Sequence, residues 1–313
     1  MQPRFPSLRQ LDLSHLVVGS TWLRELGSLR CLKTLRLTFQ ELNNAATAGD
    51  AVRFPSLPSL AHLSVGVWPG PPELHIQLDG LPALTELELE GGRVAVQASR
   101  PPPQLKGLGA CAEHLAVDFA ALLSLKSATF STEGQLEAPA SIAAATALTY
   151  LQLDEWGPSA LQLLCSLPPS VRCISVLDSE LPQEAADLVG NMTGLVGLEL
   201  NNGGPVPAED APLWAGLRAF AYCLVAYDVE AGDVLKGLRY ASKLEVLQVH
   251  LDLQHPDIQL MDMEERSAQT ANLVRNLPGL MASDLSYSKG ASRPCRHKGA
   301  AVDPLAGLQL SCI

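Results

Sequence analysis

The stretch LTELELEGG at residues 84–92 recurs, with small changes, along most of the chain. Near-copies are LRQLDLSHL at 8–16, LKTLRLTFQ at 32–40, LTYLQLDEW at 148–156 and LVGLELNNG at 195–203. The shared frame is L-x-x-L-x-L, in which the first, fourth and sixth residues are apolar and the fifth is usually polar. A frame that recurs at a steady interval indicates a repeat architecture.

The frame returns every 20–28 residues, which is enough chain to leave one strand and come back beside it. Alternation of apolar and polar residues predicts a short strand with one buried face. A crossover between successive strands makes them parallel. The eleven frames start at Leu8, Leu32, Leu60, Leu84, Leu105, Leu125, Leu148, Val171, Leu195, Leu217 and Leu244.

The segments between the frames differ from one repeat to the next. Apolar spacing, prolines and early acidic residues predict helices within 159–170, 182–194 and 228–243. Alternating residues at 73–80 and 113–119 predict short extended pieces instead. No repeat can bury its own leucines, so the repeats must stack to form a common core.

This frame resembles the leucine-rich repeat family, intracellular type, over about residues 8–255. The resemblance implies an α/β solenoid with a parallel sheet on its concave side, helices and extended pieces on its convex side, and a ligand usually held on the concave face. Family repeats commonly carry Asn or Cys at the ninth position, whereas this chain has residues such as Gly92, Glu113 and Trp156 there. Without an asparagine ladder, the polar backbone groups of that turn must find other partners.

The frames predict a solenoid over residues 1–282 and an irregular or disordered tail over 283–313, which is rich in Ser, Gly, Ala and basic residues. The first frame starts at Leu8, and no cap for the end of the solenoid is visible before it. Either residues 1–7 cap the core poorly or the chain is part of a longer protein.

Composition narrows the possible partners and compartments. The net charge of −11 and pI near 5.1 argue against nucleic acid, which requires a basic face. The seven cysteines form no CxxC pair, as expected for free thiols in a reducing compartment. No secretory leader is seen, and the apolar windows are too short to span a membrane. We therefore expect a soluble, cytoplasmic protein without membrane insertion; its oligomeric state stays open.

Motifs for catalysis are missing from the sequence. It contains neither a phosphate-binding glycine loop nor a dinucleotide fingerprint, a zinc-protease helix or a nucleophile elbow. The seven histidines are spread without the spacing of metal ligands. We expect no enzymatic activity, no cofactor and no metal.

The residues that point outward from the predicted sheet are the candidates for binding. Glu86, Glu88 and Glu90 form an acidic triplet on one strand, and like charges at this spacing repel one another. A basic partner would relieve the repulsion, and so would basic neighbours in the same sheet. The predicted contact residues are Arg36, Glu86, Glu88, Glu90, Thr129, Tyr150, Gln152, Asp154, Ser175, Glu199 and Asn201.

The basic neighbours occupy the second position of the frame in six of the eleven repeats. A row of this kind is a common solubility device, so a merely solvated strand face is the alternative to a binding site. The residues are Arg9, Lys33, Lys106, Lys126, Arg172 and Arg218.

Together these features predict a non-catalytic module that binds another protein on its concave face. Two alternatives follow from the resemblance to intracellular repeat proteins. The chain could be the substrate-receptor part of an F-box ubiquitin-ligase subunit, with the F-box upstream of Met1. It could instead be a cytoskeletal or ciliary scaffold. The sequence does not identify the partner.

Overall fold

The structure is a computed structural model of the 313-residue chain. It describes residues 5, 7–14, 20–40, 52–68, 74–97, 102–131, 135–137, 139–154, 156–157, 159–177, 181–201, 205–224, 236–252, 280 and 282–288. The chain divides into two compact units, Met1–Ser170 and Val171–Ile313, and each is described by itself.

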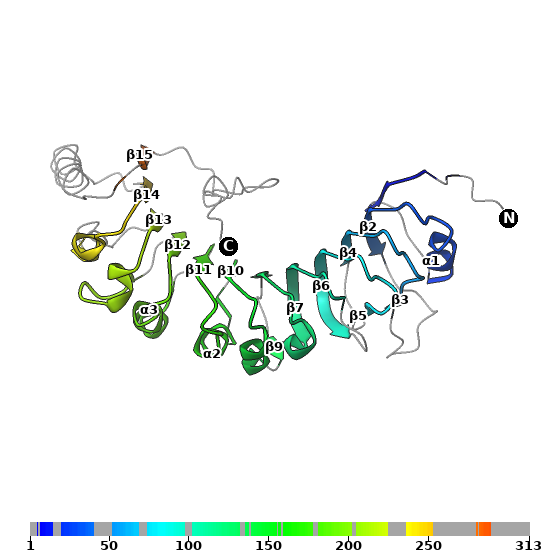
Figure 1. The fold of residues 1–313 in the computed structure, drawn as a ribbon, viewed down its shortest axis with the longest axis horizontal. Coiled ribbons are helices and arrows are strands. Elements are labelled where there is room, and N and C mark those ends of the chain that lie inside the picture. Colours follow the sequence, from blue (N-terminus) through cyan, green and yellow to red (C-terminus); the bar gives the residue numbers. More distant parts are fainter. Residues whose placement is uncertain are drawn as a thin grey trace. The chain divides into compact units, whose positions relative to one another are not determined.

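The first unit is built on a row of parallel strands in sequence order (Figure 1). Identical frame positions face one another in the register, as in Leu35↔Leu63, Leu63↔Leu87 and Leu87↔Leu108. The strands are β1 (Gln10–Leu13), β2 (Thr34–Gln40), β4 (His62–Trp68), β6 (Glu86–Gln97), β7 (Gly107–Val117), β8 (Ser127–Ser131) and β10 (Tyr150–Leu153).

The second unit repeats this arrangement, again with equal frame positions in register, as in Leu198↔Phe220 and Phe220↔Leu247. Its strands are β11 (Cys173–Val176), β12 (Gly197–Asn201), β13 (Ala219–Leu224), β14 (Val246–Asp252) and β15 (Ala282–Ser288). The predicted α/β class, with parallel repeat strands and a mixed opposite side, is confirmed by this topology.

Strand β15 differs from the expectation of an irregular tail. Residues 282–288 pair in parallel with β14, and Leu285 lies opposite Val249 at the sixth position of the frame. A twelfth frame therefore starts at Leu280, where Ser283 occupies the apolar fourth position. This serine and the long interval after Leu244 hid the repeat from pattern analysis; residues 289–313 lie outside the described part.

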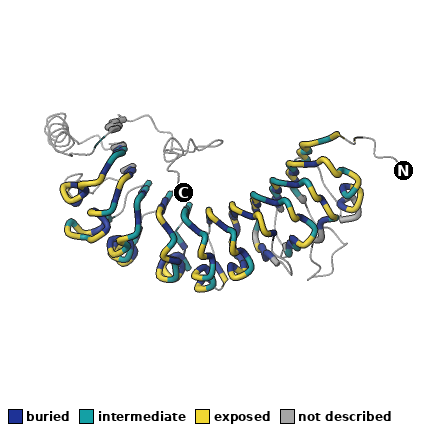
Figure 2. Tube along the Cα trace, in the orientation of Figure 1, coloured by how far each residue is buried: buried dark blue, intermediate teal, exposed yellow. Residues whose placement is uncertain are grey.

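The core consists of the leucine positions of the frame, stacked from strand to strand. Leu87 and Leu89 are 1% and 3% exposed, and their strand is paired on both sides. Figure 2 shows buried and exposed residues alternating along the strands. In the frame that starts at Leu125, Ala128 takes a leucine position, and Phe119 packs edge-on against Phe130 with ring centroids 5.9 Å apart. Large aromatic side chains thus fill volume that the smaller residue leaves.

The side opposite the inner strands is mixed, as predicted (Figure 1). Helices α2 (Ala160–Cys165) and α3 (Gln183–Gly190) lie within the segments predicted to be helical. Of the third predicted helix, the structure describes a 3-10 turn at Gly237–Tyr240, and 228–235 lie outside the described residues. The other helical elements are α1 (Ser20–Leu26) and the 3-10 turns η1 (Phe119–Ala121), η2 (Pro139–Ala144) and η3 (Pro212–Ala215).

Extended pieces replace helices in the middle of the first unit. β5 (Leu74–Gln77) pairs with the second half of β6, and β9 (Gln135–Glu137) pairs with the second half of β7. β3 (Val52–Arg53) pairs with β5. The extended segments predicted around 73–80 and 113–119 are confirmed.

The long strands explain why these repeats need no asparagine at the ninth position. Gly92 and Glu113 lie inside β6 and β7, where the chain continues as a strand instead of turning. The flanking pairs Gly91↔Ala112 and Arg93↔His114 keep the ladder intact on either side. Backbone groups that an asparagine would satisfy in a turn lie here within strands that are paired on both sides of the ninth position.

A second backbone ladder joins the repeats just before each strand. The carbonyl oxygen of Ala61 accepts the N–H groups of Thr85 and Glu86 at 2.8 and 3.0 Å, and the Thr85 hydroxyl donates to the same oxygen at 2.9 Å. The Lys106 carbonyl likewise accepts from Lys126 and Ser127 at 2.7 and 2.9 Å. These shared acceptors hold successive strands in one register.

We expect the substitution Leu87→Ala to destabilise the first unit strongly, because it opens a cavity in a core shared by three strands. Truncation of a buried leucine costs about 2–5 kcal/mol. Urea denaturation followed by circular dichroism measures the loss. Glu113→Ala, at an exposed position of the neighbouring strand, is the control and should change stability by less than about 0.5 kcal/mol. Equal midpoints for the two variants would contradict the assigned core.

Candidate functional site

The strands that carry the repeat frame point their third, fifth and seventh frame residues away from the core. We call the surface formed by these side chains the strand face. Parallel register brings these positions of neighbouring repeats side by side. Glu86 lies between His62 and Gly107, Glu88 between Ser64 and Gly109, and Glu90 between Gly66 and Cys111, all as pairs of the ladder. The acidic triplet of β6 is thus flanked by His62 and otherwise by glycine, serine and cysteine.

Glycines on β7 leave space that the glutamates use. A Cβ atom at Gly107 would collide with the carboxylate of Glu86, so the Glu86 side chain lies over the backbone of β7. At Gly109 the nearest atom to such a Cβ is the Glu88 Cγ at 3.8 Å, an ordinary contact distance. The floor of the face is therefore lowest along β7.

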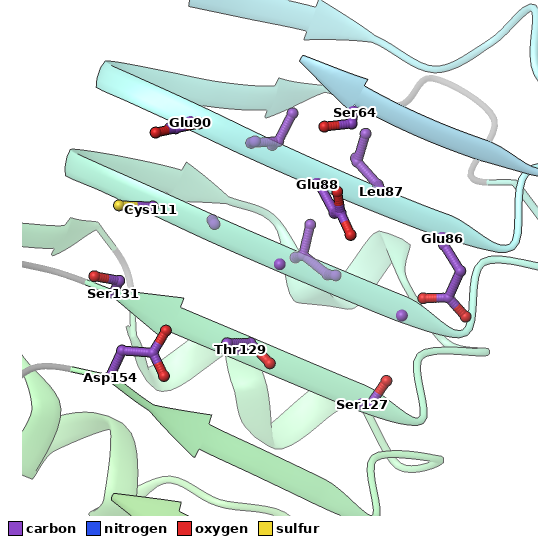
Figure 3. A pocket seen from close by; sticks show the side chains of 15 residues that line it. Ser64, Glu86, Leu87, Glu88, Glu90, Cys111, Ser127, Thr129, Ser131 and Asp154 are labelled. Carbon is purple, nitrogen blue, oxygen red and sulfur yellow. The ribbon is translucent and has the colours of Figure 1, made fainter. Parts of the chain in front are cut away.

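The lowered floor and its rim form a depression of about 400 Å³ over β6, β7 and β8, which we call the acidic hollow (Figure 3). Carboxylates of Glu86, Glu88, Glu90 and Asp154 border it. Short polar side chains complete the lining: Ser64, Cys111, Ser127, Thr129 and Ser131. A hollow with carboxylates and hydroxyls around a backbone floor suits a long cationic side chain, which carries several N–H donors.

The arginine and lysine side chains near the triplet, Arg36 and Lys106, do not lie directly opposite it in the ladder. Neither strand beside β6 places a lysine or arginine opposite Glu86, Glu88 or Glu90. Partial burial raises the pKa of Glu86 above its ordinary value, the Glu88 charge raises it further, and the cations of His62 and Lys106 work in the opposite direction. The alternative of a solvated face balanced by neighbouring lysines and arginines stays a prediction beside that of a binding site, since Arg36 lines a depression with Glu86 and Glu88.

Tyr150, Gln152 and Asp154 form a hydrogen-bonded chain that ends at Asp154, which lines the hollow. The Tyr150 hydroxyl donates to Gln152 Oε1 at 2.7 Å, and Gln152 Nε2 donates to Asp154 Oδ1 at 2.6 Å. Each bond joins outward residues two apart on or just after β10. The chain orients the Asp154 carboxylate at the border of the hollow.

Arg36 lies in a second, smaller depression of about 160 Å³ beside the first. Its lining includes His62, Glu86 and Glu88, so it shares two carboxylates with the acidic hollow. The structure thus brings eight of the predicted contact residues together on the first unit: Arg36, Glu86, Glu88, Glu90, Thr129, Tyr150, Gln152 and Asp154.

The remaining three predicted residues lie on the second unit. Glu199 and Asn201 are on β12, half-buried. Ser175 occupies its predicted outward position but is 0% exposed, and its hydroxyl donates to Glu199 Oε2 at 2.8 Å. Ser175 therefore orients a carboxylate and does not itself face solvent.

The basic row of the second unit is engaged with its own unit. Arg218 forms a two-pronged pair with the Glu245 carboxylate, with nitrogen–oxygen distances of 2.7 and 2.8 Å. Arg172 donates to the Gly194 carbonyl at 2.9 Å. In this unit the second-position residues stabilise the contact between repeats, as well as keeping the surface polar.

Several residues of the hollow were missed from the sequence. Ser127 is at the third position and Cys111 and Ser131 at the seventh, while Gly107 and Gly109 provide the floor. The signal was available, because the same count of outward positions that found Glu86 and Glu90 applies to every repeat. A single serine, cysteine or glycine at such a position does not by itself indicate a binding site in the sequence.

The described part of the chain gives no indication of a metal centre or a membrane span. Its His, Cys, Asp and Glu side chains form no group of three or more that could hold a metal ion. None of its helices is long and apolar enough to cross a bilayer.

Comparisons with known proteins add little to this picture. No family model matches the chain, and no curated protein matches it. Among solved structures, the chain is similar to an internalin from Listeria monocytogenes, with 18% sequence identity and a TM-score of 0.43. That alignment covers 91% of this chain and 83% of the internalin. The repeat fold rests on the strand order and register of the chain itself.

The raised pKa of Glu86 predicts a pH-dependent effect of Glu86→Gln on stability. A carboxyl whose folded-state pKa lies above its ordinary 4.5 stabilises the fold while protonated, and this contribution is lost as pH rises through the folded pKa. The glutamine variant should therefore gain stability relative to the natural protein between pH 4 and pH 7. Because Glu86 remains exposed on one side, the gain should be small.

Urea midpoints of both proteins at pH 4 and pH 7 test this, with Glu113→Gln as the matched control for removing one exposed acid. A Glu86→Gln variant that loses relative stability at pH 7 would show that neighbouring cations dominate over burial.

Proposed function

We propose that this chain is a non-catalytic protein-interaction module whose strand face on the first unit binds a partner segment rich in lysine or arginine. The observation that carries the proposal is the acidic hollow, in which three glutamates of β6 border the glycine floor of β7. The repeat scaffold suits the role, because each strand is fixed by its two neighbours and presents its outward residues at regular spacing.

Electrostatics favours a cationic occupant. Glu86, Glu88 and Glu90 are all exposed and repel one another along a single strand. A lysine or arginine side chain placed over Gly109, where the nearest Glu88 atom leaves ordinary contact distance, would relieve that repulsion and lie within reach of several carboxylates. The net charge of −11 would also speed the encounter with a basic partner.

The hydroxyl rim supports a peptide rather than a bare cation as the occupant. Ser127, Thr129 and Ser131 lie along β8 at alternate positions, so their hydroxyls are spaced as outward residues of one strand. Such groups can both donate to and accept from the backbone of an extended segment. Carboxylates would then select the side chain while hydroxyls hold the main chain.

We also propose that the protein is cytoplasmic. Among the described cysteines, Cys31, Cys111 and Cys165 are exposed and form no disulfide, as expected where thiols stay reduced. The F-box and cytoskeletal or ciliary alternatives stay predictions from the sequence, since no described residue bears on them.

A displayed library of random 12-residue peptides, selected on the immobilised chain, tests the proposal. We expect enrichment of peptides with two or more lysines or arginines. Changing Glu86, Glu88 and Glu90 together to Gln should lower the affinity for those peptides roughly tenfold or more, because close charge pairs contribute about 1.5–7 kcal/mol at interfaces. Selection without a basic preference, or equal affinity for the triple variant, would contradict the proposal.

Two further variants distinguish the contribution of the acidic hollow to binding from that of the overall negative charge. The control changes three exposed acids away from the strand face, Glu25, Glu113 and Glu184, together to Gln. It removes an equal number of negative charges and should leave peptide binding almost unchanged. Gly109→Leu adds bulk to the floor while keeping every carboxylate, and a Cβ atom at Gly109 meets its nearest neighbour, Glu88 Cγ, at an ordinary 3.8 Å. Loss of binding in Gly109→Leu would support a seated side chain, whereas unchanged binding would favour a diffuse acidic surface.

A further inference from the structure

We propose that His62 makes the strand face proton-sensitive: a proton taken up by its imidazole weakens the hold of the acidic hollow on a cationic partner. The inference rests on the proposed function, and it assigns to that surface a regulatory residue. It stands on the position of His62 beside the triplet.

The register places His62 directly against the acids. His62 on β4 lies opposite Glu86 on β6, and adjacent strands of a sheet are about 4.8 Å apart. His62 and Glu86 line the same depression of about 160 Å³, together with Glu88 and Arg36. The imidazole is exposed.

The charges around His62 come from three other repeats. β2 contributes Arg36, β6 contributes Glu86 and Glu88, and Lys106 of the next repeat acts on Glu86 from the far side. Of these side chains, histidine is the one whose charge normally changes between pH 5 and pH 8. A proton on His62 therefore adds a positive charge at the border of the hollow while the arginine and lysine keep theirs.

Coupling between His62 and Glu86 is already present in the electrostatics of the site. Partial burial raises the pKa of Glu86, and the His62 cation lowers it. A protonated imidazole thus holds Glu86 in its ionised form but competes with an incoming lysine for that carboxylate. The added charge on His62 therefore weakens the attraction between the Glu86 carboxylate and a cationic partner.

His114 provides the matched control. It lies in the second half of β7, away from frame positions three, five and seven, and its Nε2 is 3.1 Å from Glu137 Oε1. Replacing His114 by Gln removes one histidine from the same unit without altering the charges that line the hollow.

The first measurement needs no partner. Carbon-13 NMR of the Glu86 carboxyl, followed from pH 3 to pH 8, reports its titration in the natural protein, His62→Gln and His114→Gln. We expect His62→Gln to move the midpoint to higher pH, because the cation that favours the carboxylate is gone, and His114→Gln to leave it in place. An unchanged midpoint in His62→Gln would overturn the inference.

The second measurement uses a fluorescent hexalysine peptide at 0.15 M salt. Its affinity for the natural protein should fall roughly threefold between pH 7.5 and pH 6.0, the size expected for one charge added at short range near the surface. His62→Gln should abolish most of this change, and His114→Gln should retain it. The same pH dependence in His62→Gln would overturn the inference.

The two measurements distinguish the ways in which the account can fail. If hexalysine binds the natural protein at neither pH, the proposed function is wrong, and the NMR titration still decides whether His62 and Glu86 are coupled. If hexalysine binds with no pH dependence, the proposed function stands and the switch is wrong.

Discussion

The structure depends on one constraint: no repeat can hide its leucines without the repeats on either side. Leu87 becomes buried only because Leu63 and Leu108 lie opposite it in neighbouring strands. Each fully buried leucine contributes about 1.5–3 kcal/mol, and the contribution exists only in the stacked form. Equal frame positions must therefore align, and every other property of the strand face follows from that alignment.

Alignment turns a linear pattern into a surface. Once positions three, five and seven are in register, a residue of one repeat meets the residue of the next at the same position. The hollow arises where long acids on β6 meet glycines on β7, so that Glu86 extends over Gly107. Its charge is concentrated because no lysine or arginine occupies the opposite positions. A hollow bordered by carboxylates thus arises from ordinary repeat residues.

Much of this could be predicted from the sequence, because the burial signal has a fixed period. The frame located the strands, their parallel order and the outward positions of Glu88, Thr129 and Gln152. It missed β15, where Ser283 takes the place of a leucine, and it did not anticipate that Ser175 would be fully buried. The frame specifies which way a side chain points, but burial also depends on what packs beside it.

The convex side was predictable only in part, for a physical reason. Its segments are short, and each is held mainly by contacts with its neighbours rather than by its own propensity. The sequence lacks an asparagine ladder, and for two repeats the structure gives the reason: β6 and β7 continue through the ninth position as strands.

The most direct test of the shared core is a double-mutant cycle on two leucines of one column. Leu63→Ala and Leu87→Ala, singly and combined, should show a coupling of about 0.5–3 kcal/mol in unfolding free energy, since both line the same stack. Leu87→Ala combined with Leu198→Ala, in different units, should be additive within about 0.5 kcal/mol. Additive effects for Leu63 and Leu87 would contradict a core held in common by adjacent repeats.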